Sequence, residues 1–180
     1  MDLFLHIGMA NGWDHVTVEA RAYKQGFSSS WWGPGAAKGY YMGADAKGQT
    51  VLDAPACPWG INVPTGLATD LDVAGVVDGA NMHLRGGGGA GAAGSANVGA
   101  SFVVRPHHDA GDYCCGFLYY ESLASRYVKG TRGRVVFCHI PGETDDESLQ
   151  KARNSILAVI GTAVEKVLEN RTTARVFAHE

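Results

Sequence analysis

Short apolar runs and longer amphipathic stretches follow one another along the chain, a pattern typical of proteins that contain both strands and helices. Residues 3–9 form a short apolar run, and residues 15–24 alternate between β-branched and polar side chains. Both stretches predict β-strands, because branched side chains fit a pleated, half-buried surface. The N-terminal part of the chain therefore supplies two strands.

The last third of the chain has the clearest pattern. Residues 101–106 and 134–141 are apolar runs that predict strands, and residues 111–130 between them predict a helix that closes with lysine and glycine. This order predicts a right-handed β-α-β unit with two parallel strands. The start of the helix and the carboxyl end of the second strand would then lie at one edge of the sheet.

A long C-terminal helix is predicted after a Thr-Asp-Asp-Glu sequence at residues 144–147, which has the pattern of a capping box. Apolar residues then recur every 3.6 positions, which indicates one buried face. These residues are Leu149, Ala152, Ile156, Val159, Ile160, Ala163 and Val167.

The middle of the chain is interrupted by glycine, proline and tryptophan. Residues 26–66 predict loops, with room for a hairpin among them, because no hydrophobic period survives these interruptions. Residues 69–84 have apolar positions near helical spacing and predict a helix, with Thr69 or Asp70 as its cap.

Residues 85–100 consist mainly of glycine and alanine and predict a flexible insert within a single domain that spans residues 1–180. Gly89, Gly91 and Gly94 match the spacing of a dinucleotide-binding loop. Such a loop must follow a strand and open a helix, whereas here a predicted helix precedes it and a predicted strand follows. Nucleotide binding is therefore not favoured.

Composition narrows the class of protein. The 180 residues carry a formal net charge of -3, which argues against the basic face of a nucleic-acid-binding protein. The N-terminus lacks the pattern of a signal peptide, and no apolar run approaches membrane-spanning length. We expect a soluble, cytoplasmic protein with neither nucleic acid nor membrane as its partner.

The four cysteines, Cys57, Cys114, Cys115 and Cys138, have neither zinc-site nor disulfide-framework spacing, so free thiols are expected. Cys114 and Cys115 lie near the start of a predicted helix, where the helix dipole lowers a thiol pKa. His139 would reach the same edge of the sheet and complete a Cys-His nucleophile. The alternative is that both cysteines are small buried residues and His139 a structural histidine, and local spacing alone favours that interpretation.

Two stretches resemble known motifs. "DAGDYCCGFLYYESL" followed by "VVFCHIP" resembles the nucleophile and histidine motifs of type I pyroglutamyl peptidases, and "LFLHIGMANGWDHVTVEARAYKQGF" is similar to that family's segment carrying the triad glutamate. The resemblance implies an α/β fold of the phosphorylase/hydrolase-like kind, a three-layer α/β/α sandwich with a mostly parallel sheet. It implies Cys115 as nucleophile, His139 as acid and base, and Glu19 as the residue that orients His139, while Cys114 packs in place of a leucine.

The resemblance implies a cysteine peptidase that removes N-terminal pyroglutamyl residues from peptides and needs no metal or organic cofactor. Residues 107–109, His-His-Asp, are interpreted as a strand exit and helix cap rather than a metal site. The chain begins at the second part of the family pattern, so we expect an N-terminally truncated chain that can form a homo-oligomer. The alternative is a non-catalytic remnant of the fold that acts as a binding or structural protein.

Overall fold

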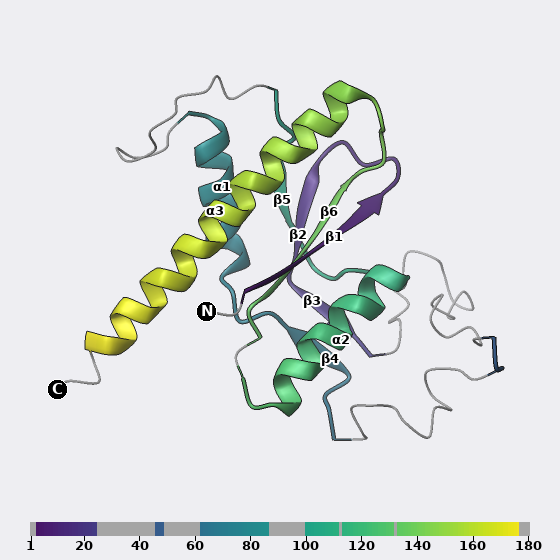
Figure 1. The fold of residues 1–180 in the computed structure, drawn as a ribbon, viewed down its shortest axis with the longest axis vertical. Coiled ribbons are helices and arrows are strands. Elements are labelled where there is room, and N and C mark those ends of the chain that lie inside the picture. The colour runs from purple at the N-terminus through teal and green to yellow at the C-terminus, as the bar shows by residue number, and fades with distance from the viewer. Residues whose placement is uncertain are drawn as a thin grey trace.

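The computed structural model describes residues 3–24, 46–48, 62–86, 100–111, 113–131 and 133–176, and Figure 1 shows their arrangement. The strands are β1 (Phe4–Ala10), β2 (Val16–Glu19), β3 (Arg21–Tyr23), β4 (Gly66–Ala68), β5 (Val104–His107) and β6 (Val135–Pro141). The helices are α1 (Val73–Leu84), α2 (Cys114–Val128) and α3 (Asp146–Val176).

Four strands form the main sheet in the order β1-β6-β2-β5, and β3 pairs with β4 in a separate two-stranded sheet. β1 and β6 are parallel over seven residue pairs, from Phe4 with Val135 to Ala10 with Pro141. β2 and β5 are also parallel, whereas β2 and β6 are antiparallel. The main sheet is therefore mixed and mostly parallel.

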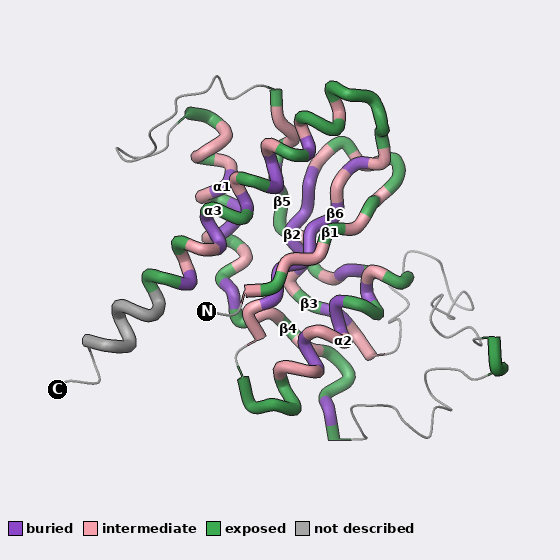
Figure 2. Tube along the Cα trace, in the orientation of Figure 1, coloured by how far each residue is buried: buried purple, intermediate pink, exposed green. Residues whose placement is uncertain are grey.

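Helices cover both faces of the sheet (Figure 1). α1 and α3 pack against each other on one face, over a core that contains Val18, Val104 and Cys138. α2 covers the other face, over a second core that contains Tyr119 and Phe137. Figure 2 shows the buried residues concentrated along the central strands between these layers. This arrangement confirms the predicted three-layer α/β/α architecture.

Strand alternation decides which side chains face α2. Because successive side chains of a strand point to opposite faces, Val16 and Val18 of β2 join the core under α1 and α3, and Thr17 and Glu19 face the other way. The same rule applies to β6, where Cys138 faces α1 and α3. His139 of β6 therefore lies on the same side of the sheet as Glu19.

Two predictions about strands are wrong. Residues 15–24 do not form one strand: β2 ends at Glu19, and β3 pairs with β4 instead of continuing along β5. The predicted parallel β-α-β unit is also wrong. β2 lies between β5 and β6, and β5 and β6 run in opposite directions. A sequence specifies each strand locally, but its pairing partner is set by contacts distant along the chain.

The helices form where predicted, but their caps differ. Asp72, not Thr69 or Asp70, caps α1 by accepting a hydrogen bond from the Gly75 backbone N–H at 3.0 Å. Thr69 instead donates to the Gly133 carbonyl, and Asp70 accepts from the Gly133 N–H. These two residues tie the entry of α1 to the loop before β6.

The capping box before α3 is also shifted. The Asp145 carboxylate accepts a hydrogen bond from the Ser148 backbone N–H at 2.9 Å, so Asp145 rather than Thr144 caps the helix. Most of the predicted loop region at residues 26–66, and most of the predicted insert at residues 85–100, lie outside the described residues. Within the described ranges, no helix has the length and apolar character required to cross a bilayer.

Candidate active site

Glu19 is the centre of a polar cluster on the face of the sheet covered by α2. Its side chain is fully buried, with 0% exposure. Its Oε1 accepts hydrogen bonds from Thr17 Oγ1 at 2.5 Å and from His139 Nδ1 at 2.9 Å. Its Oε2 accepts a hydrogen bond from His107 Nδ1 at 2.7 Å. Both carboxylate oxygens are therefore satisfied despite their burial, as buried charge requires.

Strand register explains how one carboxylate reaches two histidines. Glu19 pairs directly with His107 in the β2–β5 ladder, and Thr17 pairs with His139 in the β2–β6 ladder. His139 is thus a diagonal neighbour of Glu19 on the same face, within reach of a glutamate side chain.

The hydrogen bonds set the charge of Glu19. Burial alone would raise the pKa of the Glu19 carboxyl, but the hydrogen bonds from His107, His139 and Thr17 outweigh burial, and the pKa lies below its usual value. Glu19 is therefore ionised at neutral pH. An ionised carboxylate only accepts hydrogen bonds, so His139 carries a proton on Nδ1 and its Nε2 is the nitrogen available to exchange one.

Cys115, at the second position of α2, lies close to this cluster. Its Sγ is 2.8 Å from the position that a Cβ on Gly8 would occupy, and Gly8 pairs with His139 across the β1–β6 ladder. The Phe137 ring borders the same position at 3.1 Å, and its centroid is 5.1 Å from that of His139. The thiol of α2 therefore lies over β1, next to the strand that carries His139, on the face of the sheet that α2 covers.

The chemistry of the Cys115 thiol differs from the expectation drawn from the helix start. Burial raises the pKa of the Cys115 thiol, and Cys114 and Glu19 act in the same direction. Among the hydrogen bonds of the described residues, none joins Cys115 to His139. The His139 ring is instead hydrogen-bonded to Glu19. Burial is the largest cause of the rise, because Cys115 packs against the core under α2.

The other described cysteines differ in exposure. Cys114 is exposed, so the prediction that Cys114 packs in place of a leucine is wrong; Cys115 is the residue of the pair that packs. Cys138 is fully buried on the opposite face of the sheet, and burial strongly raises its pKa. Cys57 lies outside the described residues.

Sequence reasoning missed three residues of the cluster. The strand exit predicted at residues 107–109 is confirmed, because β5 ends at His107, but the His107 side chain binds Glu19, and α2 is preceded by Tyr113 rather than capped by Asp109. Thr17 was not singled out, although a hydroxyl two residues before a buried acid on the same strand face is a usable signal.

Trp13 is the third missed residue. Its ring stacks on His15 at 5.2 Å and meets the rings of His107 at 5.2 Å and His139 at 5.9 Å edge-on. Gly12, with φ of 81°, provides the turn that directs the chain from β1 back to this position. Trp13 therefore borders both histidines that bind Glu19.

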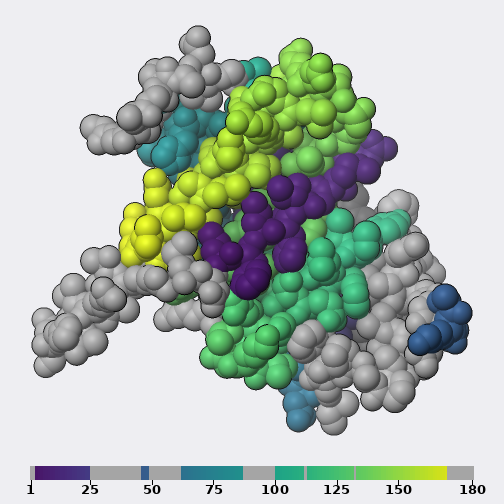
Figure 3. Space-filling model, viewed as in Figure 1, coloured from purple at the N-terminus to yellow at the C-terminus, as the bar shows by residue number. Residues whose placement is uncertain are grey.

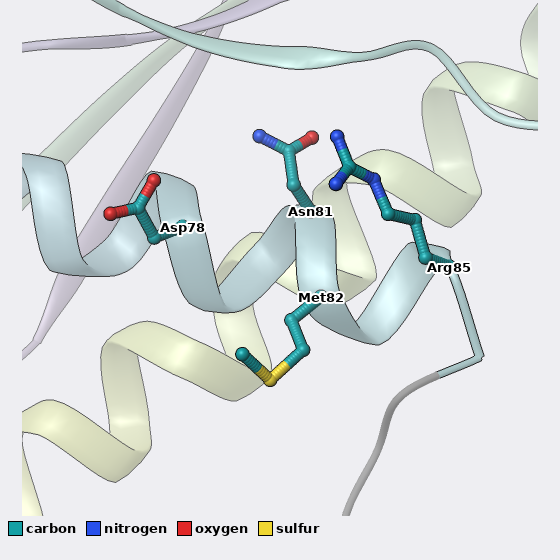
Figure 4. Close-up of a pocket in the computed structure, with 4 residues that line it drawn as sticks. All are labelled: Asp78, Asn81, Met82 and Arg85. Atoms are coloured by element: carbon teal, nitrogen blue, oxygen red, sulfur yellow. The ribbon is translucent and has the colours of Figure 1, made fainter.

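A separate hollow of about 280 Å³ is lined by Asp78, Asn81, Met82 and Arg85 of α1 (Figure 4). Asp78, Asn81 and Arg85 project from one side of the helix, whereas Met82 projects from the opposite side. Asn81 is engaged with the Val104 backbone of β5, through both its amide nitrogen and its oxygen. This hollow lies away from the Glu19 cluster, and its side chains do not converge on one point.

A metal site is not apparent in the part of the chain that the structure describes, where no three His, Cys, Asp or Glu side chains are arranged to hold an ion. In the Glu19 cluster, the Nδ1 atoms of His107 and His139 both point at the carboxylate. The arrangement fits proton transfer and nucleophilic chemistry by a thiol, an imidazole and a carboxylate.

Comparison with known proteins identifies the fold. No model of a protein family matches the chain, and no curated protein matches it. Among solved structures, the chain is similar to pyrrolidone carboxyl peptidase from the hyperthermophile Pyrococcus furiosus, with a TM-score of 0.57, 19% sequence identity, and coverage of 94% of this chain and 70% of that chain.

A mutant of the same pyrrolidone carboxyl peptidase gives a TM-score of 0.56 and 18% identity over 91% of this chain and 69% of that chain. A likeness at this level of identity shows a shared fold. It confirms the α/β fold class that the sequence predicts.

Proposed function

We propose that this protein is a cysteine peptidase of the pyroglutamyl type, which removes an N-terminal pyroglutamyl residue from a peptide. Cys115 is the nucleophile, His139 the acid and base, and Glu19 the residue that orients His139. The observation that carries the proposal is the Glu19–His139 hydrogen bond of 2.9 Å on the sheet face where Cys115 packs over Gly8. The shared fold with pyrrolidone carboxyl peptidase supports it.

In the proposed reaction, His139 Nε2 takes the proton of the Cys115 thiol, and the sulfur attacks the carbonyl carbon that links the pyroglutamyl ring to the next residue. The C–N bond breaks and His139 donates the proton to the departing amine. Water then attacks the thioester, with His139 as base, and releases pyroglutamate and the free thiol. Glu19 stabilises the imidazolium that forms twice in this cycle.

The raised pKa of the Cys115 thiol bears on the first step. A thiol that is mostly protonated at neutral pH needs a base at the moment of attack, and His139 with Nδ1 held by Glu19 supplies one. A peptide in the site must therefore bring the sulfur and His139 Nε2 together. The chemistry requires a free thiol and so fits the reducing cytoplasm.

The adjacent cysteines provide a matched test. Cys115→Ala removes the proposed nucleophile, whereas Cys114→Ala removes an exposed thiol one residue away. With a pyroglutamyl-aminomethylcoumarin substrate, we expect Cys115→Ala to lower kcat by about 10⁴-fold or more. Cys114→Ala should retain the activity of the unmodified protein. Equal activity in both variants would refute the assignment of Cys115.

A non-catalytic binding protein is the second candidate, favoured by the raised pKa of the Cys115 thiol and its packing against the core. Labelling with limiting iodoacetamide, followed by peptide mapping, distinguishes the two candidates. The peptidase proposal requires Cys115 to be alkylated, and a pyroglutamyl peptide to slow that alkylation. Binding of the peptide with no protection of Cys115 and no turnover would favour the second candidate.

A further inference from the structure

One carboxylate in this structure orients two imidazoles. Glu19 accepts from His139 on Oε1 and from His107 on Oε2, at 2.9 and 2.7 Å. A catalytic triad of a nucleophile, a base and an orienting acid requires only one of these histidines. His107 is therefore an additional ionisable group in direct contact with the residue that orients the proposed base.

The hydrogen bonds fix the proton on His107. Its Nδ1 lies 2.7 Å from Glu19 Oε2 and 2.8 Å from the Asp109 carbonyl oxygen, and both of these atoms only accept. Nδ1 therefore carries a proton in every charge state. The second nitrogen, Nε2, gains a proton when the ring becomes a cation, and the ring is 42% exposed, so water reaches it.

The exposure of the two histidines differs. The His139 side chain is 10% exposed and packed between Phe137 and Trp13, whereas His107 is partly open to solvent. Glu19 is buried between them at 0% exposure. A change of charge on His107 thus acts on His139 through a carboxylate that is shielded from water, where electrostatic effects are larger than at the surface.

We propose that His107 is a positioning residue for the proposed peptidase reaction: its imidazole holds Glu19 in place and, when protonated, competes with His139 for the charge of that carboxylate. With His107 neutral, Glu19 supports an imidazolium on His139 fully. With His107 cationic, that support is shared between the two imidazoles. A change of charge on His107 therefore alters the surroundings of the His139 ring through Glu19.

Other groups near His107 are accounted for. From its own segment, Asp109 contributes a carbonyl and a carboxylate, and together with Glu19 it raises the pKa of His107, the Glu19 hydrogen bond being the largest cause. From the turn after β1, Trp13 contacts the ring edge-on, and His15 stacks on Trp13. From α2, the Cys115 thiol lies close enough to Glu19 for the charge of the carboxylate to raise the pKa of the thiol.

The test uses two variants of His107 and a neighbouring control. His107→Asn keeps an N–H near the position of Nδ1 but cannot become a cation, and His107→Ala removes both functions. His108→Asn is the control, because His108 is 69% exposed and its contact with the Asp109 carboxylate is 3.5 Å long. Each protein is titrated between pH 5 and 9 with the histidine ring signals followed by NMR, and kcat and KM are measured over the same range.

In the unmodified protein, the His139 ring signals should change as His107 titrates, at a pH above 6.5 because the pKa of His107 is raised. In His107→Asn this change should be absent. His108→Asn should leave it in place. A His139 signal that responds to pH in the same way with and without His107 would overturn the proposal.

The kinetic result separates positioning from folding. His107→Ala should lower kcat by about 100-fold with little change in KM, because a displaced Glu19 leaves His139 misaligned. His107→Asn should recover most of this loss at pH 8 and alter the pH profile. The proposal rests on the peptidase assignment only for these rates: if Cys115→Ala proves inconsequential, the effect of His107 on the His139 ring signals still stands or falls by NMR alone.

Discussion

At the scale of single residues, the proposed site depends on glycine at position 8, where there is no side chain to displace the Cys115 thiol. Gly8 is part of β1, opposite His139. A Cβ at this position would lie 2.8 Å from Cys115 Sγ and 3.1 Å from the Phe137 ring. Since its backbone is not in the left-handed region, glycine is required here by the close approach of the thiol rather than by backbone conformation.

We expect Gly8→Ala to displace the Cys115 thiol and to destabilise the fold by about 1–3 kcal/mol through overpacking. Peptidase activity should fall more steeply than stability, because displacement of a reacting atom by 1 Å costs about 100-fold in rate. Urea unfolding and turnover of the fluorogenic substrate measure the two effects.

A double-mutant cycle identifies the cause of the Gly8→Ala effect. If the added methyl group collides with sulfur, its cost in stability should be smaller in a Cys115→Ala background, where that sulfur is gone. An unchanged cost would assign the collision to Phe137 instead.

The residues of the proposed site could be predicted only as far as their motifs reach. Cys115, His139 and Glu19 each stand in a short stretch that resembles a known pattern. His107 and Trp13 do not, and their places depend on the pairing of β2 with β5 and on the turn before Trp13. The sequence around β6 is apolar on both faces, so it does not reveal which side of the sheet His139 faces.

At the scale of elements, α1 and α3 approach each other closely at Gly79 of α1. A Cβ on Gly79 of α1 would collide with the Thr162 side chain of α3, whereas a Cβ on Gly161 would meet nothing within 4 Å. Both glycines lie inside helices, where alanine is favoured by about 1 kcal/mol. The two positions therefore form a matched pair that separates helix propensity from packing.

Gly161→Ala should stabilise the protein by about 1 kcal/mol, because the gain in helix propensity is not opposed by any contact. Gly79→Ala should destabilise it, because the helices must separate or Thr162 must shift, at a typical cost of about 1–3 kcal/mol. Thermal or urea unfolding of both variants provides the comparison. Stabilisation by Gly79→Ala would mean that α1 and α3 are less closely packed than the structure shows.

The positions of the strands and helices could be predicted far better than the pairing of the strands. The stretches that became β1, α2, β6 and α3 carry strong local patterns, and each forms close to its predicted position. The β5–β6 relationship could not be derived, since a strand order of β1-β6-β2-β5 is fixed by contacts between distant parts of the chain. The expected proximity of Cys115 and His139 was derived from a β-α-β geometry that the structure contradicts, so the resemblance of the two motifs is the sequence argument that still joins these residues.

At the scale of the whole molecule, the polar cluster lies between the sheet and the α2 layer, while β1 forms an edge of the sheet at the surface between α2 and α3 (Figure 3). Tyr119 of α2 donates a hydrogen bond to the Glu19 backbone carbonyl at 3.0 Å, which links the helix to the strand that carries the cluster. The cluster should therefore contribute to global stability as well as to chemistry.

The pH dependence of the cluster's contribution to stability follows from the pKa shifts of Glu19 and His107. The pKa of Glu19 is lowered from 4.5 in the folded state, so its contribution is present above pH 4.5 and is lost as the pH falls through the folded pKa. The pKa of His107 is raised from 6.5, so its contribution is full below pH 6.5 and is lost as the pH rises through the folded pKa. The stabilisation from this pair is thus greatest between pH 4.5 and 6.5.

Replacing Glu19 by glutamine should remove both the loss of stability at low pH and the loss of stability at high pH. Glu19→Gln keeps the shape of the side chain but presents an amide to histidine N–H groups, and we expect a loss of about 2–4 kcal/mol near pH 5.5, where both contributions are present. The difference in unfolding free energy between the two proteins should shrink toward pH 3 and toward pH 9. Partly buried His6, whose pKa is lowered by its burial, opposes the His107 contribution but is common to both proteins, so the difference cancels it. Urea unfolding at intervals of one pH unit tests this, and a difference that stays constant from pH 3 to 9 would show that Glu19 stabilises the fold by packing alone.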